Sequence, residues 1–218
     1  MSTPVKVTFL RPLDGELERV PLLKFRLTYE GELRATQRDA MANQPNPLAS
    51  HKHGIRRSFH KQLKQLWSIT PLLSTYTRAR EGDIGNRPIQ SSGAYLDYPN
   101  HKKIPLLEYV AGNFNNNGYR FVPLVCAEFS LLCSISILFL RRDIPGSAIS
   151  AGDIDNRVKT IIDALSMPIH ANELAGNEIP QVGEDPFFCL LENDRLVSHF
   201  EVETDVLLDE PDPRKRNR

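Results

Sequence analysis

The stretch LLCSISILFL at residues 131–140, joined by a loop to GDIDNRVKTIIDAL at residues 152–165, decides the fold. The first segment is a mostly apolar run of strand length, and such a run is typical of a buried strand. The second segment predicts a helix from about Asn156 to Ser166, because apolar residues recur there at helical spacing, namely Val158, Ile161, Ile162 and Leu165. A strand that leads into a helix in this way indicates an architecture of both element types.

Further elements of both types surround this pair. Alternating apolar residues predict a strand at residues 22–29, and helical spacing predicts a helix at residues 55–67. Further strands are expected at residues 119–125, 187–191 and 196–208, with loops at residues 41–53 and 171–186. Asn117-Gly118 is a strong hairpin-turn signal just before one of these strands.

The expected segments include both helices and strands. Residues 1–218 are expected to form a single domain, since no linker or internal repeat interrupts them. Within it we expect a core motif region at about 120–210, a loop-rich insertion at 70–118 and a mobile basic tail at 211–218.

The composition is that of a globular protein. Of the 218 residues 40% are hydrophobic and 25% are charged, which is enough apolar material for one compact core. The three cysteines are too few and too irregularly spaced for a disulfide framework or a zinc site. We therefore expect Cys126, Cys133 and Cys189 to be small buried residues with free thiols.

No targeting or membrane segment is expected. The N-terminal residues have no basic region followed by an apolar run. Residues 122–140 are nearly all apolar, but Pro123 and Glu128 interrupt them, and two buried strands fit them better than a membrane span. The prediction is a cytoplasmic protein with no membrane partner.

The formal net charge is zero, yet the charge is segregated along the chain. Residues 52–64 contain five basic side chains and no acid, whereas residues 184–210 contain nine acids and one basic residue, Arg195. A neutral protein can bind a polyanion through one basic face, because salt limits electric fields to short range. The expected helix 55–67 has such a face, formed by Arg56, Arg57, Lys61 and Lys64; an ordinary solvated helix face is the alternative.

The histidines near this helix have no acid or cysteine beside them. We therefore expect His51, His53 and His60 to be solvated residues of the basic surface and not metal ligands.

The residues that indicate chemistry lie at the start of the second helix. Asp153 and Asp155 alternate at the end of a loop, so both carboxylates point in one direction if the backbone there is extended. Asn156 is a good N-cap, and Lys159 and Asp163 follow Asp155 on one helical face. Ligands that offer only oxygen suit Mg²⁺ or Mn²⁺, so this stretch predicts a divalent-metal site.

Three simpler interpretations compete. The acids can favour the positive end of the helix dipole without binding any ligand. A surface ion-pair ladder of Asp155, Lys159 and Asp163 is common on helices and contributes little stability. A calcium loop fails, because its sixth position is Val158 instead of glycine and its twelfth is Ala164 instead of glutamate.

This arrangement resembles the core of the RusA-type Holliday junction resolvases. The resemblance covers roughly the last 90 residues of the chain. It consists of the apolar strand, the basic pair Arg141-Arg142, the pattern D-x-D-N-x-x-K-x-x-x-D-A-L from Asp153 to Leu165, and the later acidic stretch at 192–194. The connection between the helix and Asp194 is longer than in the family, and Asn193 stands in place of the first residue of the acidic pair.

The resemblance implies an α+β fold in which a mixed β-sheet packs against helices, with the family's core in the C-terminal half of the chain. It also implies a homodimeric endonuclease that cleaves branched DNA with Mg²⁺ or Mn²⁺ and no small-molecule cofactor. Asp153, Asp155 and Asp194 match the metal-binding carboxylates of the family, and Lys159 matches its catalytic lysine. Arg141 and Arg142 join the basic face of residues 56–64 as candidate DNA contacts.

Two other functions stay open. One is a nuclease for other structured nucleic acid, such as forks or flaps, and the other is a relative that binds DNA without cutting it. A phosphotransferase or glycosyltransferase with a DxD motif is less well supported, since the chain has no Gly-rich phosphate loop.

Overall fold

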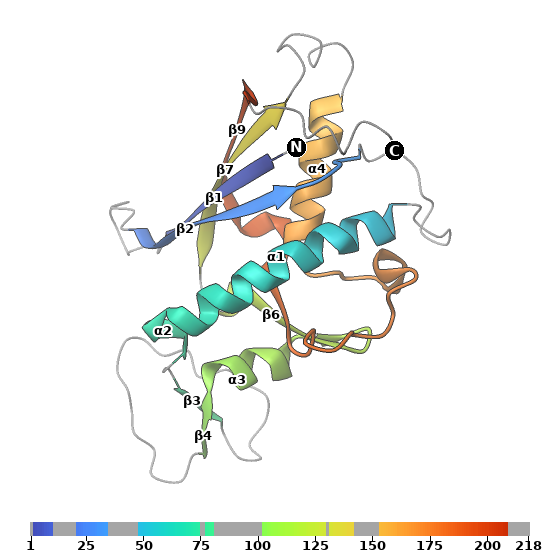
Figure 1. The fold of residues 1–218 in the computed structure, drawn as a ribbon. Helices are drawn as coiled ribbons and strands as arrows, with labels where there is room; N and C mark the ends of the chain where they lie inside the picture. The colour runs from blue at the N-terminus through green and yellow to red at the C-terminus, as the bar shows by residue number, and fades with distance from the viewer. Residues whose placement is uncertain are drawn as a thin grey trace.

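A mixed four-stranded sheet forms the centre of the protein (Figure 1). The structure is a computed structural model that describes residues 2–10, 21–34, 48–74, 77–80, 102–129, 131–141 and 153–208. The strand order is β2 (Pro21–Glu30), β1 (Ser2–Leu10), β7 (Leu132–Arg141) and β9 (Val197–Val206). The pairs β2–β1 and β1–β7 are antiparallel, whereas β9 runs parallel to β7. The predicted strands 22–29, 131–140 and 196–208 are therefore confirmed.

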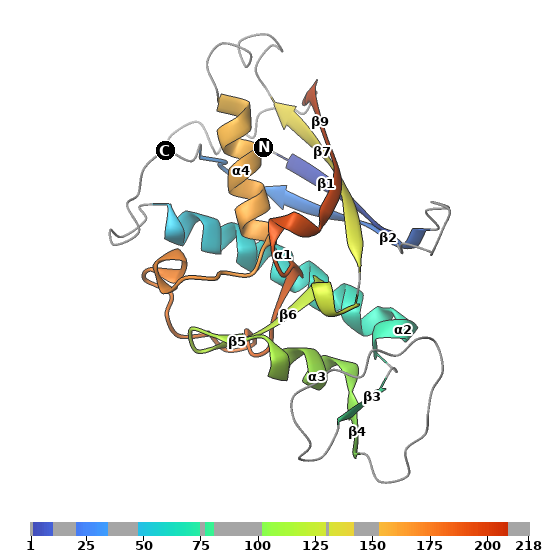
Figure 2. The same cartoon turned by 180° about the vertical axis from the view of Figure 1, so that it is seen from behind.

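Two long helices cover one face of this sheet (Figures 1 and 2). Helix α1 spans Ala49–Ile69 and helix α4 spans Asp153–Leu165. The apolar residues of β7 that alternate toward the helices (Cys133, Ile135, Ile137 and Phe139) are buried with Ile161 and Leu165 of α4. The alternating apolar residues of β7 and the apolar residues of α4 at helical spacing thus pack in one core.

A second, smaller sheet packs on the other side of α1. It consists of β5 (Asn115–Asn116), β6 (Tyr119–Val125) and β8 (Phe187–Leu191), and β6 and β8 are parallel. Asn117 and Gly118 have φ angles of 51° and 80° in the turn between β5 and β6, which confirms the predicted hairpin turn. Almost every residue of β6 and β8 is buried. Helix α1 therefore lies between this sheet and the four-stranded sheet.

The region expected to be a loop-rich insertion contains more regular structure than predicted. It includes α2 (Pro71–Ser74), the strand pair β3 (Thr77–Arg80) and β4 (Lys102–Pro105), and helix α3 (Leu106–Asn113). Helix α3 buries Leu106, Val110 and Ala111 against the core. Residues 81–101 and the tail 211–218 lie outside the described residues.

Helix α1 begins six residues earlier than the predicted start at Ile55. The expected loop 41–53 is therefore helical from residue 49 onward, while residues 41–47 lie outside the described part. The polar segment His51-Lys52-His53 concealed this extension, because Lys52 and His53 are buried in spite of their polar side chains. Three 3₁₀ turns complete the chain: η1 (Ala127–Phe129), η2 (Ala171–Leu174) and η3 (Asp194–Leu196).

The predictions for the cysteines are confirmed. Cys126, Cys133 and Cys189 are free and buried, and burial raises the pKa of Cys126 and of Cys133 to about 12. These thiols therefore stay protonated near neutral pH and act as small core side chains. In the part of the chain that the structure describes, no helix has the length and apolar character required to span a membrane.

Candidate functional site

The polar face of α4 presents two of the residues expected to act in chemistry. Asp155 and Lys159 are exposed and stand four positions apart, so they project from the same side of the helix. Neither side chain forms an ion pair or a hydrogen bond with another described residue. This face therefore offers a carboxylate and an ammonium group to a ligand.

Helix α4 begins at Asp153, three positions earlier than expected. Asn156 consequently lies inside the first turn and is not the N-cap, and the residues from 153 to 155 are helical, not extended. Positions 153 and 155 lie about 200° apart around a helix axis, so the expectation that an extended backbone aligns them is wrong. The early start has a physical reason, since aspartates favour the positive end of a helix dipole.

Asp163, on the same face two turns further along, has a partner in α1. Its Oδ2 lies 2.5 Å from Nζ of Lys52, and the Lys52 residue is only 8% exposed. This ion pair joins α4 to α1 and neutralises the Asp163 carboxylate. It argues against the alternative interpretation of a surface ladder through Lys159, and Asp163 is not free to bind a cation.

Asp194 lies at the opposite end of α4 from Asp155. It begins η3, which follows β8, and the last residue of β8, Leu191, bridges Ser166 just after α4 ends. Asp155 lies in the first turn of α4, about 15 Å of helix rise before Leu165. Figures 1 and 2 both show the chain entering β9 beside the lower, C-terminal end of α4.

A single chain therefore does not bring Asp155 and Asp194 together. Among the described residues, no group of three histidine, cysteine, aspartate or glutamate side chains is placed to hold a metal ion. The structure describes the backbone of Asp153, which belongs to α4, but not its side chain.

Arg56 is a core residue and not part of a solvated face. It is 1% exposed, and its guanidinium donates hydrogen bonds to the carbonyl oxygens of Asp163 (2.9 Å) and Ser166 (3.3 Å). These carbonyls lie at the C-terminal end of α4, where the negative end of the helix dipole also stabilises a cation. The expectation that Arg56 contacts DNA is wrong, because position 56 faces α4.

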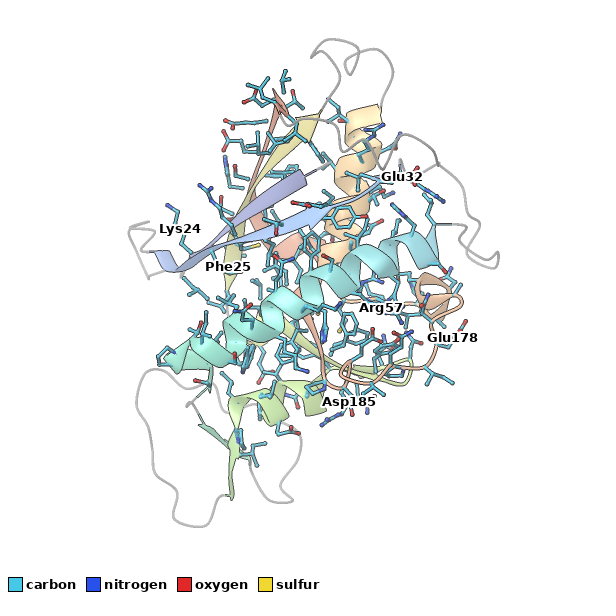
Figure 3. All side chains as sticks on the ribbon, in the orientation of Figure 1. Lys24, Phe25, Glu32, Arg57, Glu178 and Asp185 are labelled. Atoms are coloured by element: carbon cyan, nitrogen blue, oxygen red, sulfur yellow. The ribbon has the colours of Figure 1, made fainter. Side chains whose placement is uncertain are left out.

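Arg57 and Lys64 face the loop of residues 171–186. In Figure 3 Arg57 points from α1 toward this loop. Its Nε donates to Oε1 of Glu184 at 2.5 Å, and Lys64 Nζ donates to the Gly183 carbonyl at 3.1 Å. Burial raises the pKa of Glu184, but the hydrogen bonds from Arg57 and the Gln181 N–H outweigh it and keep that pKa below its ordinary value. Of the predicted basic face, Lys61 and Lys64 are the exposed members.

Two of the three histidines are buried, contrary to expectation. His60 is 4% exposed; its Nδ1 accepts the Phe188 N–H at 2.9 Å, and its Nε2 lies 3.2 Å from the Gly183 carbonyl. His53 is fully buried beside the rings of Tyr119 and Phe187, and neither ring nitrogen has a hydrogen-bond partner. Burial lowers the pKa of His53 to about 4. His51 accepts the Arg34 N–H at 3.2 Å.

The remaining candidates for DNA contact are at the end of β7. Arg141 is the last residue of β7, its side chain is outside the description, and Arg142 lies beyond the described residues. Sequence reasoning did not single out Lys52, Gln62 or Arg120, which form polar contacts with residues distant in the sequence. Their positions in the hydrophobic pattern of the helix or strand are the same as those of solvated polar residues.

Comparisons with protein-family models, with curated proteins and with solved structures found no match for this chain.

Proposed function

We propose that this protein is a divalent-metal-dependent endodeoxyribonuclease that hydrolyses phosphodiester bonds in branched DNA such as Holliday junctions. The observation that carries the proposal is the face of α4 on which exposed Asp155 and Lys159 stand one turn apart without a partner among the described residues. Asp153 begins the same helix. Charged groups that the fold does not use are available for a substrate.

The donor chemistry at the start of α4 fits Mg²⁺ or Mn²⁺. Asp155 would hold the ion, because Mg²⁺ is commonly bound by one or two carboxylates together with waters and substrate phosphate. When bound, the ion supplies an activated water and neutralises charge on the phosphate. Lys159 would donate to a phosphate oxygen and stabilise the negative charge that develops there.

DNA would contact this helix face. Lys159, Lys61 and Lys64 are exposed cations, and Arg141 and Arg142 precede the loop that leads into α4. Paired cuts in a four-way junction require two active sites related by two-fold symmetry, so we propose a homodimer. Light scattering at micromolar concentration should then report about twice the chain mass of 24.7 kDa. The proposed enzyme works in the cytoplasm and uses no small-molecule cofactor.

The position of Asp194 supports a second function. If a cut requires three carboxylates on one chain, the separation of Asp194 from Asp155 favours a protein that binds branched DNA without cutting it.

One experiment separates these functions. The full-length protein is incubated with a labelled four-way junction, a fork, a flap, a duplex and a single strand, in Mg²⁺, Mn²⁺ or EDTA. We expect cleavage of the junction with either metal and none in EDTA. Binding without cleavage would establish the second function, and cleavage restricted to forks or flaps would change the substrate.

Asp155→Asn tests the assignment of the residue. The variant should lose cleavage and keep or improve DNA affinity, because a negative charge near the phosphate is removed. The matched control is Glu178→Gln, which removes a carboxylate charge at an exposed position outside α4. Cleavage by Asp155→Asn at the wild-type rate would refute the role of this helix face.

A further inference from the structure

The two edges of the four-stranded sheet differ in whether a side chain occupies their outward backbone groups. Strands β2 and β9 are the outermost strands. On the edge of β2, the Gln62 carboxamide of α1 accepts the Thr28 N–H at 2.9 Å and donates to the Thr28 carbonyl at 2.7 Å. An amide that bonds both groups of one residue imitates a neighbouring strand, so it blocks this edge against pairing with another chain.

The edge of β9 has no such protection among the described residues. Strand β9 is ten residues long, pairs only with β7, and most of its residues are exposed, from Ser198 to Asp205 with the exception of Val202. A long exposed edge strand presents a row of N–H and C=O groups that can accept a further strand. The β9 edge is therefore the open end of this sheet.

The side chains of β9 present a different chemistry on each face. Glu201, Glu203 and Asp205 alternate and pair in register with Ser136, Leu138 and Leu140, so they lie on the face away from α1 and α4. Phe200 pairs with Ile135, which is buried in the core, but Phe200 itself is 38% exposed. One face of the edge is thus acidic, and the other offers an apolar ring.

We propose that β9 accepts an extended basic peptide segment of a partner protein by strand addition. The backbone of the segment would continue the ladder beyond β9. Its lysine or arginine side chains, at alternate positions, would lie opposite Glu201, Glu203 and Asp205, since oppositely charged cross-strand pairs stabilise a sheet. Apolar residues in between would cover Phe200. The proposal is independent of the proposed nuclease activity.

A second copy of this chain and a nucleic acid are both disfavoured as occupants. If β9 paired antiparallel with β9 of a second copy about Val202, Glu201 of each strand would lie opposite Glu203 of the other, and like charges directly opposite destabilise a sheet. The basic strand β2 of a second copy is blocked at Thr28 by Gln62. Nucleic acid is disfavoured too, because the acidic row repels phosphates.

The test uses the full-length protein and a fluorescent ten-residue peptide in which lysine alternates with valine and threonine. Fluorescence anisotropy measures binding, and amide hydrogen exchange locates it. We expect protection to increase in residues 197–206 and to stay unchanged in residues 21–30. The double variant Glu201→Gln/Glu203→Gln should weaken binding by roughly tenfold at low salt. The matched control Glu30→Gln, exposed at the other edge, should not.

A second peptide separates strand addition from simple charge attraction. It has the same sequence but carries N-methyl groups on alternate amides, which removes ladder hydrogen bonds and leaves every charge in place. We expect this peptide to bind at least tenfold more weakly. Equal binding of both peptides, or protection outside residues 197–206, would overturn the proposal. Association of the protein with itself through β9 in the absence of peptide would instead identify a second copy as the occupant.

Discussion

The carboxamide of Gln62 pairs with both main-chain groups of Thr28, and this contact fixes helix α1 to the edge of the central sheet. The Thr28 position is opposite Pro4 of β1, which has no N–H to donate. The polar groups of Thr28 therefore turn outward, where Gln62 meets them. A single glutamine thus positions the helix and closes the strand.

Gln62→Ala should lower the free energy of unfolding by about 1 kcal/mol, because two backbone hydrogen bonds are exchanged for bonds to water. Gln62→Glu should retain part of the lost stability, since a carboxylate still accepts the Thr28 N–H but cannot donate to the Thr28 carbonyl. Urea denaturation measures both. Gln65→Ala, an exposed glutamine on the same helix, is the control, and the contact has no structural role if the two alanine variants are equally stable.

Arg56 should contribute more stability than any other basic residue of α1 that was expected to contact DNA. Arg56→Ala leaves the carbonyls of Asp163 and Ser166 without their donor and opens a space beside α4. The loss should be about 3 kcal/mol, because two carbonyls lose a charged hydrogen-bond donor and the removed side chain leaves a cavity. Lys61→Ala, exposed on the same helix, should change stability by less than about 0.5 kcal/mol. Equal effects in urea denaturation would contradict the burial of Arg56.

Stability should fall as the pH is lowered, and His53 should account for part of the fall. Burial lowers the pKa of His53 to about 4, below its ordinary value of 6.5. Between these values the unfolded chain binds a proton at this residue that the folded chain does not. The His53 contribution is therefore complete above pH 6.5 and is lost progressively as the pH falls toward 4.

His53→Phe should reduce the slope of unfolding free energy against pH in this window. Phenylalanine suits a site lined by Tyr119 and Phe187, in which neither histidine nitrogen has a hydrogen-bond partner. Burial also lowers the pKa of His60, so part of the slope should remain. Urea denaturation at pH 7, 6 and 5 measures the effect. An unchanged slope in the variant would show that His53 does not titrate in this way.

The sequence was a good guide wherever one periodicity decided the structure. The alternation and apolar runs of β2, β6 and β7 and the spacing of α4 predicted their elements, and Asn117-Gly118 predicted its turn. The α+β class with a mixed sheet was implied by the resemblance, and the structure confirms it.

Burial of polar residues could not be predicted in this way. A helix packed against one surface has one polar side, but α1 lies between two sheets and buries Lys52, His53, Arg56 and His60 as well as its apolar stripe. Each of these residues, apart from His53, is matched by a partner distant in the chain, as Lys52 is by Asp163. The separation of Asp155 and Asp194 could not be predicted for a different reason, because it depends on the direction in which β9 runs beside β7.

Lys159→Ala should lower the rate of DNA cleavage by a factor on the order of 10² to 10³, the range for loss of one group that stabilises charge in a transition state. The affinity for Mg²⁺ should change little, because the proposed ligands are carboxylates. Single-turnover cleavage measures the rate, and titration with Mg²⁺ measures the affinity. Lys61→Ala is the control, although a modest loss of DNA binding is expected there. Loss of DNA binding alone in Lys159→Ala would make this lysine a positioning contact.

Asp194→Asn should reduce cleavage far less than Asp155→Asn, by no more than a few-fold. The reason is the separation of the two acids along α4: Asp155 is in its first turn, and Asp194 follows the strand that bridges Ser166 beyond its last turn. Single-turnover cleavage of a four-way junction by both variants measures the difference. If Asp194→Asn proves as inactive as Asp155→Asn, the two variants should be mixed. Recovery of cleavage in the mixture would show that Asp194 of one protomer completes the site of its partner, and no recovery would place both acids in the site of one chain, against the arrangement described above.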